Sequence, residues 1–230
     1  MSKKEITSFK KVLIANRGEI AVRIIKTLNK LKLKSVVLYS EVDKNAPYVK
    51  LANEAVKTDN GSLATSYLSI DKMIEVAIQT KCEAVHPGYG FLSENSEFAK
   101  ICVSKKLIFI GPKHHAIRKM ANKKEAKEIA KHAGVSCLPG YSINKSDTLE
   151  EIAHAAKKIG YPIMIKATAG GGGKGMRLVE SQKSLDSDLK LTKSESLSAF
   201  GSDEMILEKA MNYVRHIEVQ VLGDQKGNFI

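Results

Sequence analysis

The chain has 230 residues, of which 43% are hydrophobic and 27% are charged, which is the composition of a folded globular protein rather than a disordered one. No apolar run reaches the roughly 18 residues that span a bilayer, and the amino terminus lacks the apolar core of a secretory signal. The three cysteines, Cys82, Cys102 and Cys137, lie far apart, which argues against a disulfide scaffold and a structural zinc site. We therefore expect a cytoplasmic protein with no membrane partner.

The formal net charge is +12, which raises the question of a nucleic-acid partner. The basic residues are nearly all lysines, and they are distributed along the chain among Glu and Asp. Nucleic-acid recognition favours Arg forks and aromatic platforms instead. We therefore expect no nucleic-acid partner, and we note that a basic excess suits an anionic small ligand such as a nucleotide.

The first half of the sequence alternates short apolar runs with segments of helical periodicity. In residues 19–31, for example, apolar side chains recur at helical spacing, at Ile20, Ile24, Leu28 and Leu31. Such patterns predict strands at residues 11–15, 35–39, 83–86 and 107–110, and helices at residues 19–31, 69–81 and 97–105. This alternation predicts a parallel sheet that is covered by helices on both faces.

The second half has a different character and begins with a helical pattern over residues 114–132, which we expect to be interrupted near Asn122 and to end at Gly134. Beyond it we predict strands at residues 135–138, 161–167, 176–180, 204–208 and 216–222, and helices at residues 148–159 and 184–200. This is an α+β unit with hairpins, and we place the domain boundary near residue 120. A turn at residues 223–228 precedes a returning strand, and we expect residues outside the given sequence to complete this sheet.

The glycine-rich run KATAGGGGKG at residues 166–175 lies between two predicted strands. Successive glycine N–H groups can approach and wrap phosphate oxygens, and Lys166 and Lys174 can neutralise their charge. The run is not a P-loop, because Met176 follows the last glycine and no helix begins there, and a Rossmann fingerprint needs that helix as well. We interpret it as a hairpin that covers phosphates and is mobile at residues 169–174 without nucleotide; the alternative is an ordinary mobile surface loop.

Other candidate sites carry weaker signals. The turn at residues 15–19 lies where a Rossmann domain binds pyrophosphate, but it has a single glycine. The loop at residues 86–95 is either a ligand loop or a rigid turn. Residues 208–211 end a strand whose backbone could bind an adenine edge, or they contain an ordinary exposed Glu-Lys pair. His216 could contact a ribose or phosphate, or it could be structural, and no cluster of carboxylates indicates a Mg²⁺ site.

Five segments in this order closely resemble biotin carboxylase, the ATP-grasp component of biotin-dependent carboxylases. They are IANRGEIAVRI at residues 14–24, HPGYGFLSEN at 86–95, FIGP at 109–112, IKATAGGGGKGMR at 165–177 and RHIEVQVLGD at 215–224. The resemblance covers essentially the whole chain. It implies an α/β fold, with a Rossmann-like parallel-sheet domain at residues 1–121 and an incomplete ATP-grasp domain of α+β type at residues 122–230, whose lid spans about residues 138–210.

The resemblance also implies which residues contact ATP. At positions that match the family's motifs these are Lys123, Lys166, Gly172, Gly173, Glu208, Lys209, Ala210, Met211 and His216. Two positions depart from the family, because Ala169 stands where a further glycine is frequent and Met211 replaces a commonly aliphatic residue, which is a mild change for an apolar wall.

The activity implied is that of an ATP-dependent ligase that activates bicarbonate to carboxyphosphate, with Mg²⁺ at the phosphates, and carboxylates biotin on a carrier domain. The implied partners are that biotin carboxyl carrier domain and a carboxyltransferase, and the full-length carboxylase is expected to be a homodimer. In the family, the Mg²⁺ ligands, the bicarbonate site and the catalytic base lie beyond the position equivalent to Ile230, so we expect this chain to contain no catalytic residue and to lack bicarbonate-dependent ATPase activity by itself.

Two alternatives to this assignment stay open. The chain could belong to another ATP-grasp ligase, such as a purine-pathway carboxylase, although the segment HPGYGFLSEN disfavours this. It could also be a non-catalytic nucleotide-binding module. The final carboxyl acceptor is chosen by a different domain, so these residues do not identify it.

Overall fold

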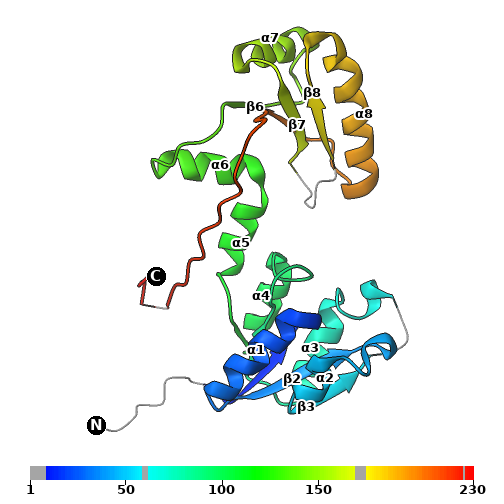
Figure 1. The fold of residues 1–230 in the computed structure, drawn as a ribbon, viewed down its shortest axis with the longest axis vertical. Helices are drawn as coiled ribbons and strands as arrows, with labels where there is room; N and C mark the ends of the chain where they lie inside the picture. The colour runs from blue at the N-terminus through cyan, green and yellow to red at the C-terminus, as the bar shows by residue number, and fades with distance from the viewer. Residues whose placement is uncertain (1–8, 59–61, 169–174, 225) are drawn as a thin grey trace. The chain divides into compact units, whose positions relative to one another are not determined.

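The computed structural model describes residues 9–58, 62–168, 175–224 and 226–230. The chain divides into two compact units, Met1–Asn122 and Lys123–Ile230, and each is described by itself (Figure 1). Gly172 and Gly173, and the mobility expected for residues 169–174, lie outside the described residues. No helix in the described part of the chain has the length and apolar character needed to cross a membrane.

The first unit is built on a five-stranded sheet in which every neighbouring pair of strands is parallel. Its strands are β1 (Lys11–Ile14), β2 (Lys34–Tyr39), β3 (Glu54–Lys57), β4 (Ala84–His86) and β5 (Ile108–Phe109). Their order is β3-β2-β1-β4-β5, so the direction of winding reverses between β1 and β4. This is the strand order of a Rossmann-like fold, in which ligands bind beyond the carboxyl ends of the strands at the reversal.

Helices cover both faces of this parallel sheet, as the sequence predicts. They are α1 (Gly18–Lys30), α2 (Pro47–Leu51), α3 (Ile70–Gln79) and α4 (Ser96–Ser104), and short 3₁₀ turns lie at Glu41–Asp43 and Leu63–Thr65. A further helix, α5 (His114–Ala121), packs against α4. Because side chains alternate along a strand, β1 contributes Val12 and Ile14 to a core beneath α1 and α2, and Leu13 to a second core beneath α3 and α4.

The second unit has a four-stranded antiparallel sheet in the order β6-β9-β7-β8. The strands are β6 (Gly140–Ser142), β7 (Ile163–Ala167), β8 (Met176–Val179) and β9 (Met205–Lys209), and the helices are α6 (Lys123–His132), α7 (Leu149–Ile159) and α8 (Gln182–Phe200). Ile163, Ile165 and Leu207 pack with Ile152 of α7 and Leu185 of α8 on one face. The alternation of side chains therefore directs Lys166 and Glu208 to the opposite face.

Several predicted elements are confirmed, and among them is the break at Asn122, which separates α5 from α6. The strand predicted at residues 135–138 is wrong, since β6 begins at Gly140. Backbone pairing decides this: the ladder joins Gly140 to Glu208 and Ser142 to Ile206, and Val135 stays 57% exposed. The sequence pattern did not predict α2 or β3, a short helix and an edge strand in which most residues are exposed or half-buried.

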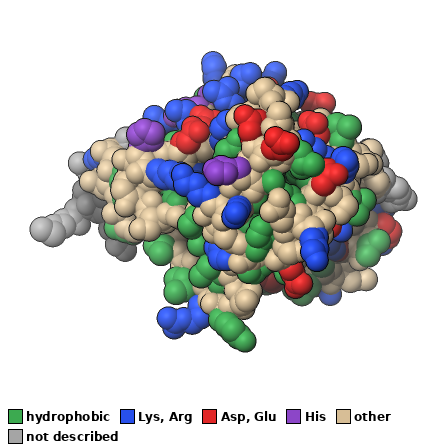
Figure 2. All heavy atoms as spheres, turned by 90° about the horizontal axis from the view of Figure 1, so that it is seen from above, with side chains coloured by type: hydrophobic (Ala, Val, Ile, Leu, Met, Phe, Trp, Pro, Cys, Tyr) green, Lys and Arg blue, Asp and Glu red, His purple; other side chains and the backbone are tan. Residues whose placement is uncertain are grey.

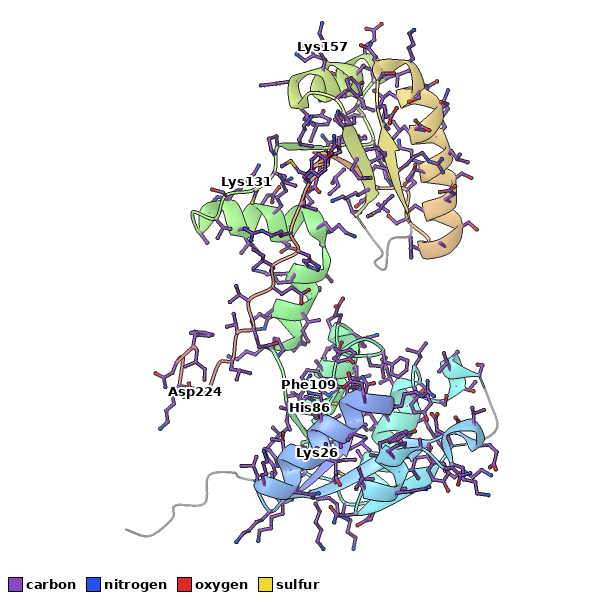
Figure 3. All side chains as sticks on the ribbon, in the orientation of Figure 1. Lys26, His86, Phe109, Lys131, Lys157 and Asp224 are labelled. Atoms are coloured by element: carbon purple, nitrogen blue, oxygen red, sulfur yellow. The ribbon has the colours of Figure 1, made fainter. Side chains whose placement is uncertain are left out.

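The strand predicted at residues 216–222 is also wrong. The segment has no regular secondary structure, and Ile217 and Val219 are 73% and 82% exposed, because none of the described strands pairs with it. The turn predicted after it is confirmed. Leu222 and Ile230 exchange backbone hydrogen bonds of 2.8 and 2.9 Å, and the Asp224 carboxylate accepts the Asn228 N–H at 2.9 Å (Figure 3).

The surface charge follows the sequence distribution. Figure 2 shows Lys and Arg side chains interspersed with Asp and Glu on the face that it displays. Some of the ion pairs join residues three or four positions apart on one helix, as between Lys190 and Asp186. In contrast, Lys123 and Lys127 of the helix α6 lie close to Lys166 of the strand β7.

Candidate functional site

The candidate site lies on the sheet face of the second unit that α7 and α8 leave open. Lys166 from β7 and Glu208 from β9 project from this face. Lys123 and Lys127 reach it from α6, where their spacing of four residues places them on one side of the helix. Four charged side chains from three separate elements thus converge.

Glu208 is the centre of this group. Its Oε1 atom lies 2.8 Å from Lys127 Nζ and its Oε2 atom 2.7 Å from Lys166 Nζ, and its side chain is only 14% exposed. Burial raises the pKa of this carboxyl. The hydrogen bonds and charges of Lys127 and Lys166 lower it by a larger amount, so the pKa of Glu208 lies below the usual value. Glu208 is therefore ionised at neutral pH and paired with a cation at each oxygen.

Lys123 holds the end of β7. Its Nζ donates hydrogen bonds to the carbonyl oxygens of Ala167 at 3.1 Å and Thr168 at 3.4 Å. Burial, together with the nearby charge of Lys166, lowers the pKa of Lys123. Two ammonium groups thus pair with the Glu208 carboxylate, and a third, that of Lys123, is bonded at the end of β7. This local excess of positive charge attracts an anion such as phosphate.

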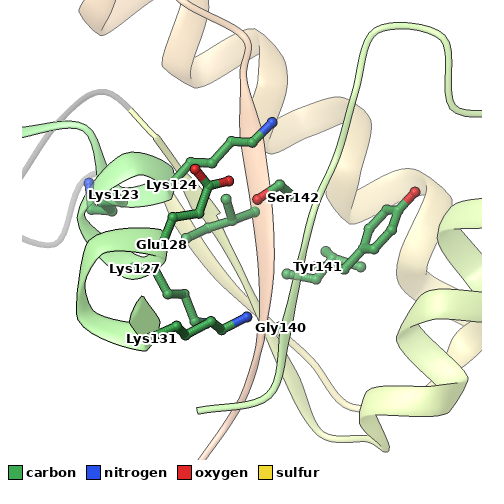
Figure 4. A pocket seen from close by; sticks show the side chains of 10 residues that line it. Lys123, Lys124, Lys127, Glu128, Lys131, Gly140, Tyr141 and Ser142 are labelled. Atoms are coloured by element: carbon green, nitrogen blue, oxygen red, sulfur yellow. The ribbon is translucent and has the colours of Figure 1, made fainter. Parts of the chain in front are cut away.

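A small hollow of about 80 Å³ adjoins this group between α6 and the strands β6 and β9 (Figure 4). Its lining includes Lys127, Glu128 and Lys131 from α6 and Gly140 and Tyr141 from β6. Pockets for nucleotide-sized ligands usually measure about 300–1,000 Å³, so this hollow by itself does not hold a nucleotide. In the described part of the chain, no group of three or more His, Cys, Asp or Glu residues could hold a metal ion.

At the end of β9, where the sequence predicts an adenine contact, several polar groups form hydrogen bonds within the chain. The Lys209 N–H donates to the Pro139 carbonyl at 2.9 Å, and the Ala210 N–H donates to the Pro162 carbonyl at 3.1 Å. The Lys209 ammonium donates to the carbonyl oxygens of Gly160 and Tyr161, at 2.9 Å each. Its side chain therefore holds the loop before β7 and does not join the Glu208 group.

The remaining expected residues lie elsewhere. Met211 is 53% exposed. His216 is in the irregular segment after β9, where its Nε2 lies 3.2 Å from Glu218 Oε1 and both side chains are more than 80% exposed. The structure thus brings Lys123, Lys166 and Glu208 together and leaves His216 apart. Sequence reasoning missed Lys127, although its position one helical turn after Lys123 was a signal that could have identified it.

In the first unit, a group of side chains closes the region beyond the carboxyl ends of β1 and β2. The Arg17 guanidinium donates to both carboxylate oxygens of Asp43, and Asp43 also accepts from the hydroxyls of Tyr67 at 2.8 Å and Tyr48 at 3.2 Å. Arg17 lies over the Tyr67 ring. These residues occupy the region where a Rossmann domain would bind pyrophosphate, which agrees with the weak glycine signal in the sequence.

The loop at residues 86–95 is anchored to the end of β1. The Asn16 amide donates to the carbonyl oxygens of Pro87 at 2.9 Å and Tyr89 at 2.7 Å. Gly88 has φ +66°, and a Cβ atom there would lie 2.8 Å from Asn16 Nδ2, so only glycine fits this approach. At the other end, Asn95 caps α4 through a 2.9 Å bond from the Phe98 N–H. This part of the chain is therefore a well-anchored turn.

Comparison with known protein families identifies both units. The family model described as biotin carboxylase, N-terminal domain, matches residues 8–117. The model described as carbamoyl-phosphate synthase L chain, ATP binding domain, matches residues 122–230. The chain belongs to the biotin carboxylase family.

Curated relatives support this assignment. The chain is 47% identical over 221 residues to the mitochondrial propionyl-CoA carboxylase alpha chain of Homo sapiens. The aligned region covers 96% of this chain and 30% of that protein. It is 46% identical over 222 residues to biotin carboxylase 2 of Bacillus subtilis, and this aligned region covers 96% of this chain and 50% of that protein. The chain therefore spans half the length or less of these relatives.

Solved structures of the family superpose closely. A biotin carboxylase from Campylobacter jejuni, in a complex named for β-γ-ATP, matches with a TM-score of 0.89 and 43% identity over 97% of this chain and 50% of that one. The biotin carboxylase domain dimer of Hydrogenobacter thermophilus 2-oxoglutarate carboxylase, in complex with MgADP, ADP and bicarbonate, matches with a TM-score of 0.86 and 41% identity over 97% of this chain and 49% of that one.

Proposed function

We propose that this chain forms the nucleotide-binding part of a biotin carboxylase, an ATP-dependent ligase that carboxylates biotin on a carrier domain by way of carboxyphosphate. In this proposal residues 1–121 are the Rossmann-like domain and residues 122–230 belong to the ATP-grasp domain, with a lid at about residues 138–210. Magnesium, bicarbonate, the carrier domain, a carboxyltransferase and a homodimeric assembly belong to the whole protein. The names of two related structures, which include ATP, MgADP, bicarbonate and a dimer, support this.

The observation that carries the proposal is the convergence of Lys123, Lys127 and Lys166 around Glu208 on the open face of the sheet. Lysine binds phosphate as a point charge on a flexible stem, and a site of this kind can position and stabilise a transferring phosphoryl group. We assign the phosphate contacts to Lys123 and Lys166, together with the N–H groups of Gly172 and Gly173, which lie outside the described residues.

We place adenine at the end of β9, beside residues 208–211. Because the N–H groups of Lys209 and Ala210 are bonded within the chain, this contact would use carbonyl oxygens or the Met211 N–H, with the Met211 side chain as an apolar wall. A contact with His216 requires the segment after β9 to change position when nucleotide binds. The relatives include carboxylases of propionyl-CoA and of methylcrotonoyl-CoA, so these residues do not select the final acceptor.

The test is the affinity of the chain for MgADP, measured by isothermal titration calorimetry at low ionic strength. Lys166→Met keeps the apolar stem and removes the charge. We expect it to weaken binding about tenfold or more, because a charge-assisted hydrogen bond contributes roughly 1.5–3 kcal/mol.

Lys157→Met is the matched control, because Lys157 is exposed on α7, which packs on the opposite face of the sheet (Figure 3). We expect its affinity to equal that of the parent. Equal affinities for the parent and the Lys166→Met variant would show that Lys166 does not contact phosphate and would remove the main support for the nucleotide site.

A further inference from the structure

Lys127 is tightly built into the open sheet face, although the family resemblance assigns it no contact with ATP. Its side chain is 19% exposed, and its Nζ lies 2.8 Å from Glu208 Oε1. The ammonium group sits directly over Gly140 of β6, where a Cβ atom would lie 2.7 Å from Lys127 Nζ. The glycine at this position therefore leaves the space that the ammonium occupies.

The position of Lys127 bears on what Lys166 can do. Lys166 Nζ lies 2.7 Å from Glu208 Oε2, so Lys166 must leave this carboxylate, at least in part, to reach a phosphate. A carboxylate that is 14% exposed and has no other cation at hydrogen-bond distance would then lose its pairing in a largely buried place, which is unfavourable. Because Lys127 occupies the other carboxylate oxygen, Glu208 keeps a partner when Lys166 moves.

We propose that Lys127 is a positioning residue of the nucleotide site, which holds Glu208 as a paired carboxylate so that Lys166 can exchange between Glu208 and the phosphates of the nucleotide. Lys127 acts through Glu208 and does not contact the ligand. The identity of the ligand rests on the proposed function above, whereas the pairing of Glu208 does not.

The first test needs no nucleotide and measures the pKa of the Glu208 carboxyl by ¹³C NMR. The charged groups that face Glu208 are Lys123 and Lys127 from α6 and Lys166 from β7. In Lys166→Met, which imitates the departure of Lys166, we expect the pKa of Glu208 to stay below the ordinary value of about 4.3. In the double variant Lys127→Met/Lys166→Met we expect it to rise above that value, because burial then dominates.

The control for this titration is Lys157→Met, because this lysine is exposed on α7, which packs on the opposite face of the sheet. It should leave the pKa of Glu208 as in the parent. If Lys166→Met alone raises the pKa of Glu208 as far as the double variant does, Lys127 does not sustain the carboxylate and the proposal is wrong.

The second test is calorimetric binding of MgADP at pH 7 in buffers with different ionisation enthalpies, which reports the protons taken up. In Lys127→Met we expect binding to weaken about tenfold, as for one lost charge-assisted bond. We also expect proton uptake in excess of the parent, because Glu208 must be protonated once Lys166 leaves it. The ionisation of the ligand itself is common to both proteins and cancels in the comparison.

A double-mutant cycle separates this role from a merely structural one. In a Glu208→Gln background, Lys127→Met should change the affinity for MgADP little, since the carboxylate through which Lys127 acts is absent. Lys127→Met with parental affinity and no extra proton uptake would overturn the proposal. If the parent itself does not bind MgADP, the proposed function fails, and the NMR titration still decides the role of Lys127.

Discussion

At the scale of single residues, Asp43 is the most heavily bonded carboxylate of the first unit. Its side chain is 8% exposed, and it is paired with Arg17, whose side chain is 41% exposed. The Arg17 hydrogen bond lowers the pKa of Asp43 below its usual value, against the opposing effect of burial, and the Tyr67 hydroxyl lowers it further. The group closes the region beyond β1 and β2 with bonds between its own side chains.

We predict that Asp43→Asn lowers the free energy of unfolding by about 2 kcal/mol. Breaking a fully buried ion pair costs more than this, but the Arg17 side chain is half exposed. Urea unfolding followed by circular dichroism measures this. The control is Glu97→Gln, which removes an exposed pair with Lys100 and should change stability by less than about 0.5 kcal/mol. An equal, small effect of both changes would contradict the prediction.

The same carboxylate sets a pH dependence. Because the pKa of Asp43 is lower in the folded than in the unfolded chain, its stabilising contribution is fully present above about pH 4 and is lost as the pH falls through the folded-state value. The difference in unfolding free energy between the parent and Asp43→Asn should therefore shrink below pH 4. A difference that stays constant down to pH 2 would show that the charge of Asp43 does not contribute.

At the scale of elements, α7 has a complete amino-terminal cap. The Thr148 hydroxyl accepts the Glu151 N–H at 3.2 Å, and the Glu151 carboxylate accepts the Thr148 N–H at 2.8 Å. This capping box satisfies two backbone donors that have no partner within the helix. The pattern is readable in the sequence, and the predicted start of this helix at residue 148 agrees with the structure to within one residue.

We predict that Thr148→Ala lowers the unfolding free energy of the second unit by about 1 kcal/mol, the usual cost of losing such a cap. Thr148→Ser is the matched control, because it keeps the hydroxyl acceptor and should remain close to the parent. Denaturation of both variants, monitored by the helical signal at 222 nm, provides the comparison. If serine destabilises as much as alanine, the cap does not act through the hydroxyl oxygen.

The two mispredicted strands show what local pattern lacks. Residues 216–222 alternate apolar and polar side chains, but a strand forms only where another strand offers hydrogen bonds, and none of the described strands does so. Residues 135–138 are mostly apolar as well, yet the backbone pairs with β9 only from Gly140 onward. In contrast, β7 and β9 have both apolar alternation and partners on each side, and the sequence predicted both of them.

At the scale of the whole molecule, most of the buried apolar side chains fall into three clusters. Two of them pack against the parallel sheet, and every member lies before Asn122. The third packs between the antiparallel sheet and the helices α7 and α8, and every member lies after Lys123. Each unit thus has its own hydrophobic core, which is the requirement for a domain that folds by itself.

We predict that residues 1–122, produced alone, fold and unfold cooperatively, because both clusters of the parallel sheet are complete in this piece. Circular dichroism and thermal unfolding test this. A shorter piece that ends at residue 82 is the control, since it lacks β4, the central partner of β1, and should not fold. Failure of the 1–122 piece to unfold cooperatively would show that it depends on the rest of the chain.

The sequence by itself determined the class of fold, the parallel sheet with helices on both faces, and the family, because apolar periodicity and long motifs are local properties of the chain. The family resemblance also implied that Lys123, Lys166 and Glu208 contact one nucleotide. Only the tertiary structure decided that Lys127 and Gly140 complete the surroundings of Glu208, and that Arg17 and Asp43 close the region beyond β1 and β2. The physical reason is that charge pairing and close approach depend on distances between elements far apart in the chain, which no local pattern encodes.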